Sequence, residues 1–241
     1  MREMIGYIRF LGKTLLRGLG LKRRRSVAPG IAIFGQNIFF DSIEPKSRSF
    51  YALEYARKFR PKSVIDVGSG GGEHAMAFLS DGAEVVCVDY GTSVYAKNSN
   101  LKGFDVLHVD FNAYNANKKF DLVWASHILE HQRNAGKFIE KLIDCCLDEG
   151  MIIITVPDFH RVLCGGHLSM WTPGILAYNI VMCGLDISDS RLIRGTNEFS
   201  IAFTPKKITL PEISYDKGDV DILSKYFPKG YCESIDQWTS W

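Results

Sequence analysis

The sequence contains the stretch Val64-Ile65-Asp66-Val67-Gly68-Ser69-Gly70-Gly71-Gly72-Glu73-His74, which decides the fold. An apolar run closes on Asp66, closely spaced glycines follow, and a segment rich in Ala, Met, Phe and Leu comes next. This order predicts a strand, a tight loop and a helix N-terminus, which together present backbone N–H groups to a polar ligand. Glycines suit such a loop because it takes unusual backbone angles and lets a ligand approach closely.

The loop departs in two ways from a dinucleotide-binding fingerprint. Its glycines are spaced G-x-G-x-G, and Glu73 stands where the fingerprint has its third glycine. Asp66 also places an acid two residues before the first glycine. Both departures favour an adenosine ligand without a pyrophosphate, of which S-adenosylmethionine is the obvious candidate. The residues of this stretch that we expect to contact it are Asp66, Gly68, Ser69, Gly70 and Gly72.

Length and composition suit one α/β domain of ordinary composition. The 241 residues can bury a sizeable core, and contents of 46% hydrophobic and 23% charged residues are usual for a globular protein. The net charge of +2 is unevenly divided, since residues 1–25 carry +7 and the rest of the chain carries −5. This acidic body disfavours a nucleic-acid partner, which requires a basic surface.

The basic N-terminal segment has the pattern of an amphipathic helix. It ends in Lys22-Arg23-Arg24-Arg25. Such a helix can lie on an anionic membrane surface or against an acidic partner. It can equally pack on its own domain with a solvated charged face, and the residues leave both readings open. The apolar residues at helical spacing are Ile5, Ile8, Leu11, Leu15 and Leu19.

Cysteine usage and hydropathy indicate a reducing compartment. The six cysteines show no C-x-x-C spacing, and several lie in apolar runs as small core residues. No apolar run approaches the length that spans a bilayer, and Arg9, Lys13 and Arg17 interrupt what would be the apolar region of a secretion signal. We expect a cytoplasmic protein, with residues 1–25 as the candidate for peripheral membrane contact.

Strands and helices alternate from residue 49 onward. Short apolar strands separated by helices predict a Rossmann-like α/β sandwich, in which helices cover both faces of a mostly parallel sheet. Glu149-Gly150 has the composition of a turn. The expected strands are 63–67, 84–88, 105–108, 121–125 and 151–156, and the expected helices are 49–59, 73–80, a short one from Thr92, and 135–147.

The rest of the chain completes this organisation. Thr172-Pro173 caps a helix that runs to Cys183, and residues 186–194 and 198–204 are expected to form a hairpin. The expected parts are an N-terminal helix with a lid or linker over 1–48, the main domain over 49–205, and a C-terminal extension over 206–241 packed on that domain.

Asp89 ends the second strand, 23 residues after Asp66. A carboxylate at that point can accept both hydroxyl protons of a ribose. The alternative is a turn or N-cap aspartate before the helix at Thr92. The glycine loop at the right distance upstream favours the ribose role, and Tyr90 would then lie against the adenine face.

Asp110 and Phe111 close the third strand. A carboxylate there can accept the adenine amino proton, which makes both residues candidates for the cofactor site. The alternative is an Asx-type turn, and the sequence does not choose between the two.

The segment His127-Ile128-Leu129-Glu130-His131 contains an H-x-x-E-H pattern. On a helix this pattern matches an inverted zinc-protease signature, with both histidines as ligands and Glu130 as base. Here it emerges from a strand in the middle of an α/β alternation, which argues strongly against that chemistry.

The chain resembles class I S-adenosylmethionine-dependent methyltransferases over about residues 49–205. The resemblance rests on the loop 66–72, on Asp89, and on the segment 126–131, which is similar to the "LEH" element of the small-molecule branch that includes the ubiquinone-pathway enzymes. Residues 166–176 are similar to a "GH…TP…L" stretch in the same branch.

This resemblance implies a seven-stranded sheet in which the seventh strand runs antiparallel between the fifth and the sixth. It also implies S-adenosylmethionine over the carboxyl ends of strands one, two and four. Ser126, directly after the fourth strand, is therefore a further candidate for cofactor contact.

A hydroxyl acceptor of the methyl group would need a base, and neutral imidazole suits that task near physiological pH. We choose His131 and His167 because each is expected beside the acceptor, after the fourth and fifth strands. His127 and His160 are weaker candidates. His160, Cys164 and His167 could chelate a metal, but a mobile substrate loop is favoured and no metal is expected.

We therefore expect S-adenosylmethionine-dependent O-methylation of a small molecule or of a glycan or lipid-linked precursor. The alternative is a non-catalytic methyltransferase-like subunit that acts through a partner. The oligomeric state does not follow from the sequence.

Overall fold

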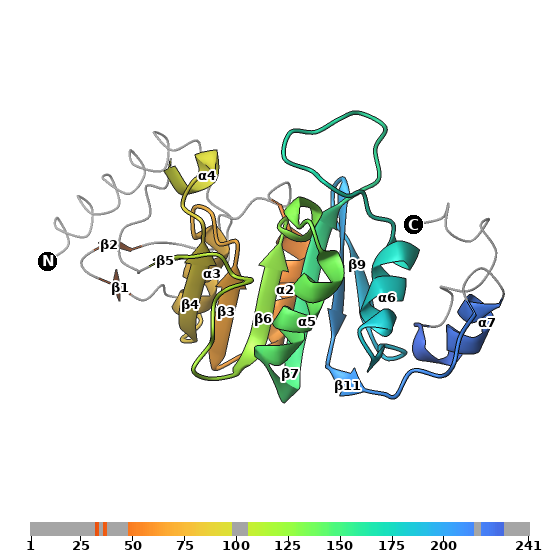
Figure 1. The fold of residues 1–241 in the computed structure, drawn as a ribbon. Coiled ribbons are helices and arrows are strands. Elements are labelled where there is room, and N and C mark those ends of the chain that lie inside the picture. Colours follow the sequence, from red (N-terminus) through yellow and green to blue (C-terminus); the bar gives the residue numbers. More distant parts are fainter. Residues whose placement is uncertain (1–31, 34–35, 38–47, 98–105, 215–217, 229–241) are drawn as a thin grey trace, which may run out of the picture. The chain divides into compact units, whose positions relative to one another are not determined.

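The computed structural model describes residues 32–33, 36–37, 48–97, 106–214 and 218–228 (Figure 1). The chain divides into two compact units, Met1–Ser47 and Arg48–Trp241. Within the first unit, β1 (Ala32–Ile33) pairs antiparallel with β2 (Gln36–Asn37). The basic helix expected over residues 1–25 lies outside the described residues.

The second unit is built on a seven-stranded sheet of order β5-β4-β3-β6-β7-β10-β9. Neighbouring strands from β5 to β7 are parallel, whereas β10 runs antiparallel to both β7 and β9. The seventh strand of this sheet thus lies between the fifth and the sixth, which confirms the predicted fold class. The strands are β3 (Ser63–Val67), β4 (Glu84–Asp89), β5 (Val106–His108), β6 (Phe120–Ser126), β7 (Cys146–Pro157), β9 (Arg191–Arg194) and β10 (Glu198–Phe203).

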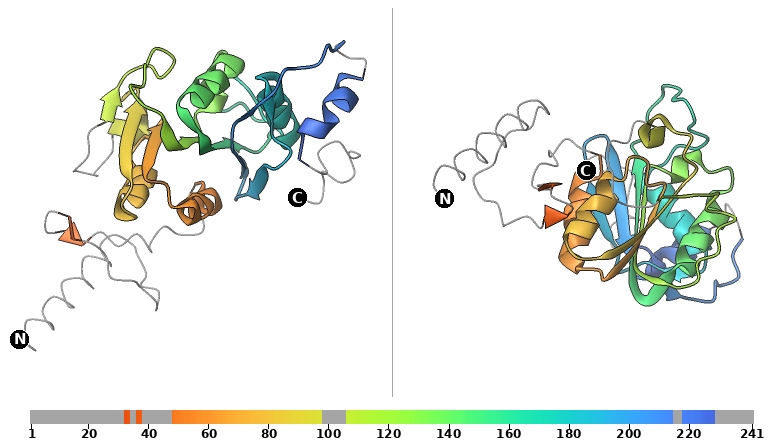
Figure 2. Two further views of the ribbon diagram at one scale, coloured as in Figure 1. Left: turned by 90° about the horizontal axis from the view of Figure 1, so that it is seen from below. Right: turned by 90° about the vertical axis from the view of Figure 1, so that its left-hand side faces the viewer.

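Helices cover both faces of the sheet, and the views in Figures 1 and 2 agree on their placement. α2 (Phe50–Phe59) and α3 (Glu73–Ser80) lie on one face, and α5 (Ala135–Asp144) and α6 (Pro173–Met182) lie on the other. The bounds of α3 are those predicted. Thr172 caps α6 as expected, because its hydroxyl accepts a hydrogen bond from the backbone N–H of Ile175 at 3.2 Å.

Shorter elements complete this unit. A two-stranded pair joins β8 (Leu185–Asp186) to β11 (Lys206–Lys207), so the predicted strand 186–194 is divided and only its second half forms the hairpin with β10. The remaining short helices are α4 (Val94–Lys97), η2 (Leu129–His131), α7 (Asp219–Leu223) and η3 (Ser224–Tyr226). No helix of the described residues is both long and apolar enough to cross a membrane.

The prediction was wrong around residues 145–150, where neither the helix end nor the turn is as expected. α5 ends at Asp144 and β7 begins at Cys146, which pairs with Phe120. The buried Cys146 thus belongs to the sheet, whereas Leu147, the last residue of the predicted helix, is exposed. Gly150 lies in an irregularity of β7, where a Cβ atom would stand 2.8 Å from Cys146 Sγ.

The core lies between the sheet and its helices. Trp124, at the centre of β6, is fully buried and meets the ring of Phe78 edge-on at a centroid distance of 5.5 Å. Its indole N–H donates to His74 Nδ1 at 3.2 Å, and His74 Nε2 lies 3.2 Å from the carbonyl oxygen of Arg48. Burial lowers the pKa of His74, so the neutral form of this histidine is favoured.

Candidate functional site

The glycine loop between β3 and α3 has the backbone that its sequence predicts. Gly68, Gly70 and Gly72 all have positive φ angles, of 75°, 53° and 79°. The N–H of Gly68 donates to the carbonyl oxygen of Val88 at 2.7 Å, which ties the loop to the end of β4. A Cβ atom on Gly68 would lie 3.0 Å from three carbons of Ile128, so the loop also packs directly against the segment after β6.

Asp89 at the end of β4 connects this loop to the next one. Its Oδ2 accepts a hydrogen bond from the N–H of Gly70 at 2.9 Å, and its Oδ1 accepts one from the N–H of Gly91 at 2.6 Å. The second bond is the turn contact of the alternative reading. The first holds the carboxylate beside the glycine loop, where the ribose reading requires it.

A narrow cleft opens at the carboxyl ends of β3, β4 and β5, beside the segment that follows β6. Among the predicted cofactor residues, Gly68, Asp89, Tyr90, Asp110 and Phe111 line it. The other lining residues, most of which the sequence did not single out, are Val67, Val88, Val109, Asn112, Ile128, Gln132 and Phe138. The cleft therefore combines apolar walls with two carboxylates, which suits the flat base and the hydroxyls of a nucleoside.

Tyr90 and Asp110 are joined at the rim of this cleft. The Tyr90 hydroxyl bonds to the Asp110 carboxylate, and its pKa is raised by partial burial and by this bond. Partial burial acts to raise the pKa of Asp110, but hydrogen bonds from Asn112 and Tyr90 outweigh it and lower that pKa. Asp110 also accepts the backbone N–H of Asn112 at 2.8 Å, which is the Asx-type turn of the alternative reading.

Asp66 lies beneath the loop and not in the cleft. It is 1% exposed, and burial raises the pKa of its carboxyl to about 7, with a further contribution from the charge of Asp89. Its Oδ2 has no hydrogen-bond partner among the described residues. Of the other candidates, Ser69, Gly70 and Gly72 belong to the loop without lining the cleft.

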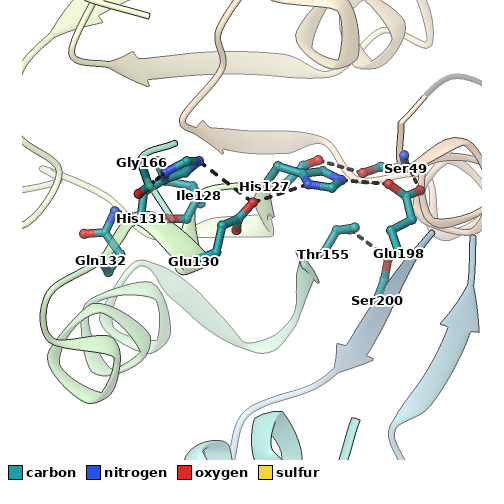
Figure 3. Close-up of polar contacts among 11 residues, drawn as sticks. Ser49, His127, Ile128, Glu130, His131, Gln132, Thr155, Gly166, Glu198 and Ser200 are labelled. Atoms are coloured by element: carbon teal, nitrogen blue, oxygen red, sulfur yellow. Dashed lines mark hydrogen bonds and ion pairs between the residues drawn. The ribbon is translucent and has the colours of Figure 1, made fainter. Parts of the chain in front are cut away.

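A second polar centre surrounds His127, beyond Ser126 at the end of β6 (Figure 3). His127 has a positive φ of 53°, so the extended backbone of β6 does not continue through it. Its Nε2 lies 2.7 Å from Glu198 Oε2, and its Nδ1 lies 3.3 Å from Glu130 Oε1. Burial acts to lower the pKa of His127, but the two carboxylates outweigh it and raise that pKa, so the imidazolium form is favoured.

Glu198, from the first position of β10, was not foreseen as a site residue. It is 4% exposed, and its Oε1 also accepts the backbone N–H of Ser49 at 2.5 Å. The hydroxyl groups of Ser49 and Ser126 bond to each other at 2.6 Å, so Ser126 meets the start of α2 rather than the cleft. A lone acid at the start of an apolar strand was the one available signal.

His131 and His167, the predicted catalytic pair, come together from two segments. Their rings meet edge-on at a centroid distance of 5.0 Å. His131 Nδ1 lies 2.7 Å from the carbonyl oxygen of Gly166, so this nitrogen carries a proton, and in the neutral imidazole the lone pair is on Nε2. Partial burial lowers the pKa of His167, and the nearby His131 and His160 lower it further against the charge of Glu130.

The H-x-x-E-H pattern does not form the helix that a zinc protease requires. Only Leu129–His131 is helical, as the short η2, and the backbone of His127 is left-handed. His127 points toward Glu198, whereas His131 points toward Gly166. The two histidines therefore do not share one face, in agreement with the prediction against protease chemistry.

Comparison with known families gives one match over most of the chain. The family model described as a methyltransferase domain matches residues 44–192. This range contains the glycine loop, the cleft, His131 and His167.

Two curated relatives carry the same description. The chain is 31% identical over 107 residues to the "Ubiquinone biosynthesis O-methyltransferase" of Rickettsia akari, a match that covers 42% of each chain. It is 25% identical over 177 residues to the protein of that description from Psychrobacter cryohalolentis, covering 69% of this chain and 63% of the relative. The matched region is therefore less than two thirds of the length of either relative.

A solved structure shares the fold. The Burkholderia thailandensis 1,6-didemethyltoxoflavin-N1-methyltransferase, determined with its substrate and S-adenosylhomocysteine, superposes with a TM-score of 0.53 at 18% identity. The match covers 65% of this chain and 76% of that one.

Proposed function

Because this chain belongs to the methyltransferase-domain family, we propose that it transfers the methyl group of S-adenosylmethionine to a hydroxyl oxygen of a small molecule. The observation that best supports this proposal is the hydrogen bond between Asp89, which lines the cleft, and the N–H of Gly70 in the glycine loop. The description of both relatives as O-methyltransferases supports oxygen as the acceptor atom. A glycan or a lipid-linked precursor fits the same proposal.

The residues of the cleft fit the adenosine part of this cofactor. Asp89 offers carboxylate oxygens to the ribose hydroxyls. Tyr90 and Phe111 offer aromatic contacts to the base, and Asp110 offers it a polar contact. The glycine loop, with its positive φ angles, lets the ligand approach the backbone. When bound, S-adenosylmethionine supplies an electrophilic methyl group on a sulfonium, whose departure needs no acid.

The protein must then orient the acceptor and remove its proton. A hydroxyl oxygen that gains a methyl group loses its proton, and a neutral imidazole beside it can accept that proton. We propose His131 and His167 for the acceptor side, since their rings meet where the segment after β6 faces the loop after β7. His131 is the better placed of the two because the carbonyl of Gly166 fixes its tautomer.

A non-catalytic role, in which the chain serves a partner protein, is the competing proposal. It accounts for the fold but assigns no task to the paired imidazoles of His131 and His167. Turnover by the isolated protein decides between the two.

The experiment compares extracts of cells with and without the gene for this protein. Each extract is incubated with the purified protein and S-adenosylmethionine, and mass spectrometry follows S-adenosylhomocysteine and metabolites that gain one CH₂ unit. We expect both products to appear together, and to be absent with the Asp89→Ala variant. Binding of the cofactor without either product in any extract would favour the non-catalytic role.

A further inference from the structure

The residues Glu130, His131 and His167 form a cluster that the methyl transfer described above does not use as a unit. Each offers one ligand atom, and these atoms all lie within 4.8 Å of one another. Glu130 and His131 are neighbours on η2, whereas His167 comes from the loop after β7. We propose that these three side chains bind one divalent cation of the zinc type at the acceptor side of the site.

The buried carboxylate of Glu130 is the first argument. Its residue is 1% exposed, and Glu130 Oε2 lacks any hydrogen-bond partner in the part of the chain that the structure describes. An unpaired carboxylate oxygen away from water is costly, and a cation is the partner that relieves that cost most completely. Figure 3 shows this carboxylate between the side chains of His127 and His131, and Oε1 is the oxygen that lies toward both.

The tautomer of His131 is the second argument. Its Nδ1–H donates to the carbonyl oxygen of Gly166 at 2.7 Å, and the Nε2 that remains lies 3.9 Å from Glu130 Oε1. Histidine ligands of metals commonly donate their other ring N–H to a backbone carbonyl, which orients the ring and fixes the free lone pair. His131 is thus held as a metal ligand is held.

The Glu130 carboxylate is oriented from the side away from His131. His127 lies between Glu130 and Glu198, with its Nε2 2.7 Å from Glu198 Oε2 and its Nδ1 3.3 Å from Glu130 Oε1. Zinc ligands lie about 3.3 Å apart, since each bond is about 2.0–2.2 Å long. Binding would draw the three side chains together by this difference, since the Glu130 and His131 atoms lie 3.9 Å apart and the whole set lies within 4.8 Å.

The ligand set indicates which cation is preferred and what it would do. Two imidazole nitrogens with one carboxylate suit zinc, cobalt or iron better than magnesium or calcium, which prefer oxygen ligands. Three protein ligands leave a position open for water or for an acceptor oxygen. A hydroxyl bound there would have a lowered pKa, so the cation would take the place of the free imidazoles of His131 and His167 in removing its proton. This role rests on the proposed function, whereas cation binding itself does not.

The test is a titration of the metal-free full-length protein with Co²⁺, followed by visible absorption, without S-adenosylmethionine. We expect one equivalent to bind, Zn²⁺ to displace it, and Mg²⁺ at the same concentration to leave it in place. His131→Ala and His167→Ala should each weaken cobalt binding at least about ten-fold. His108→Ala, which removes an exposed histidine on β5, should leave it unchanged.

Three results would overturn the proposal. The first is no cobalt spectrum at any concentration in a folded sample, and the second is equal affinity in the His131→Ala and His108→Ala variants. The third is binding that survives His131→Ala but is lost with His160→Ala or Cys164→Ser, since the cation would then be held by the loop alone. Binding of S-adenosylhomocysteine, measured separately, reports on the proposed function whatever the cobalt result.

Discussion

Asp89 Oδ2 accepts the backbone N–H of Gly70 at 2.9 Å, so the acid at the end of β4 and the glycine loop after β3 form one unit. The same carboxylate accepts the N–H of Gly91 at 2.6 Å. Two loops at neighbouring strand ends are therefore positioned by one side chain, and that side chain lines the cleft. The account of the cofactor site depends on this arrangement.

Replacing Asp89 should therefore weaken cofactor binding. Asp89→Ala removes the ribose acceptor and both loop contacts, each a hydrogen bond to a charged group worth about 1.5–3 kcal/mol, so we expect at least a ten-fold loss of affinity for S-adenosylhomocysteine. Calorimetric titration measures it. Asp148→Ala, at a carboxylate that is 94% exposed on β7, is the control and should bind normally. Equal affinities in the two variants would remove Asp89 from the site.

Gly68 should be less replaceable than another glycine with a similar backbone. An alanine with positive φ costs about 1–2 kcal/mol. At Gly82, with φ of +90° and no atom within 4 Å, we expect that cost alone. At Gly68 the new Cβ would also meet Ile128 at 3.0 Å, which adds about 1–3 kcal/mol. Urea unfolding of both variants gives the difference, and equal losses of stability would contradict the contact with Ile128.

The buried carboxyl of Asp66 should make stability depend on pH. Its pKa is about 7 in the folded protein and 3.8 ordinarily, so between these values the native state holds a proton that the unfolded chain has released. The free energy of unfolding should then fall, relative to Asp66→Asn, as the pH rises through that window, and the difference should become constant above it. Urea titrations of both proteins across the window check this. Parallel pH profiles would show that Asp66 is ionised when folded.

Glu198 should stabilise the fold through its two partners. Glu198→Gln leaves one acceptor oxygen for two donors, the Ser49 N–H and the His127 ring. We expect this change to lower the free energy of unfolding by about 1–3 kcal/mol. The matched control is Glu84→Gln, since Glu84 is 67% exposed and its pair with Lys118 should contribute at most about 1 kcal/mol. Thermal or urea unfolding compares the two. A Glu198 variant as stable as the Glu84 variant would mean that the network is not maintained in solution.

The sequence was sufficient for the parts of the fold that local pattern determines. The loop of glycines, the helix that begins at Glu73 and the cap at Thr172 depend on neighbours in the chain, and all three are confirmed. The start of β7 depends instead on where Phe120 pairs with Cys146 across the sheet. Helical periodicity through Leu147 carries no information about that pairing.

The same distinction between local pattern and distant pairing applies to the candidate site. Asp89, Asp110 and Phe111 follow strand ends, so the parallel topology alone brings them to one cleft. Glu198 reaches His127 only because β10 pairs with β7 in the sheet. These strands are far apart in the sequence, so local patterns do not predict the contact. For the same reason, the approach of His167 to Glu130 could not be foreseen from an H-x-x-E-H pattern.

The most direct measurement is an isothermal titration of S-adenosylhomocysteine into the folded full-length protein. The account expects a saturable heat with one site per chain, which Asp89→Ala weakens at least about ten-fold. A folded sample that gives no heat of binding, with no change in its thermal unfolding midpoint at saturating S-adenosylhomocysteine or S-adenosylmethionine, would contradict it.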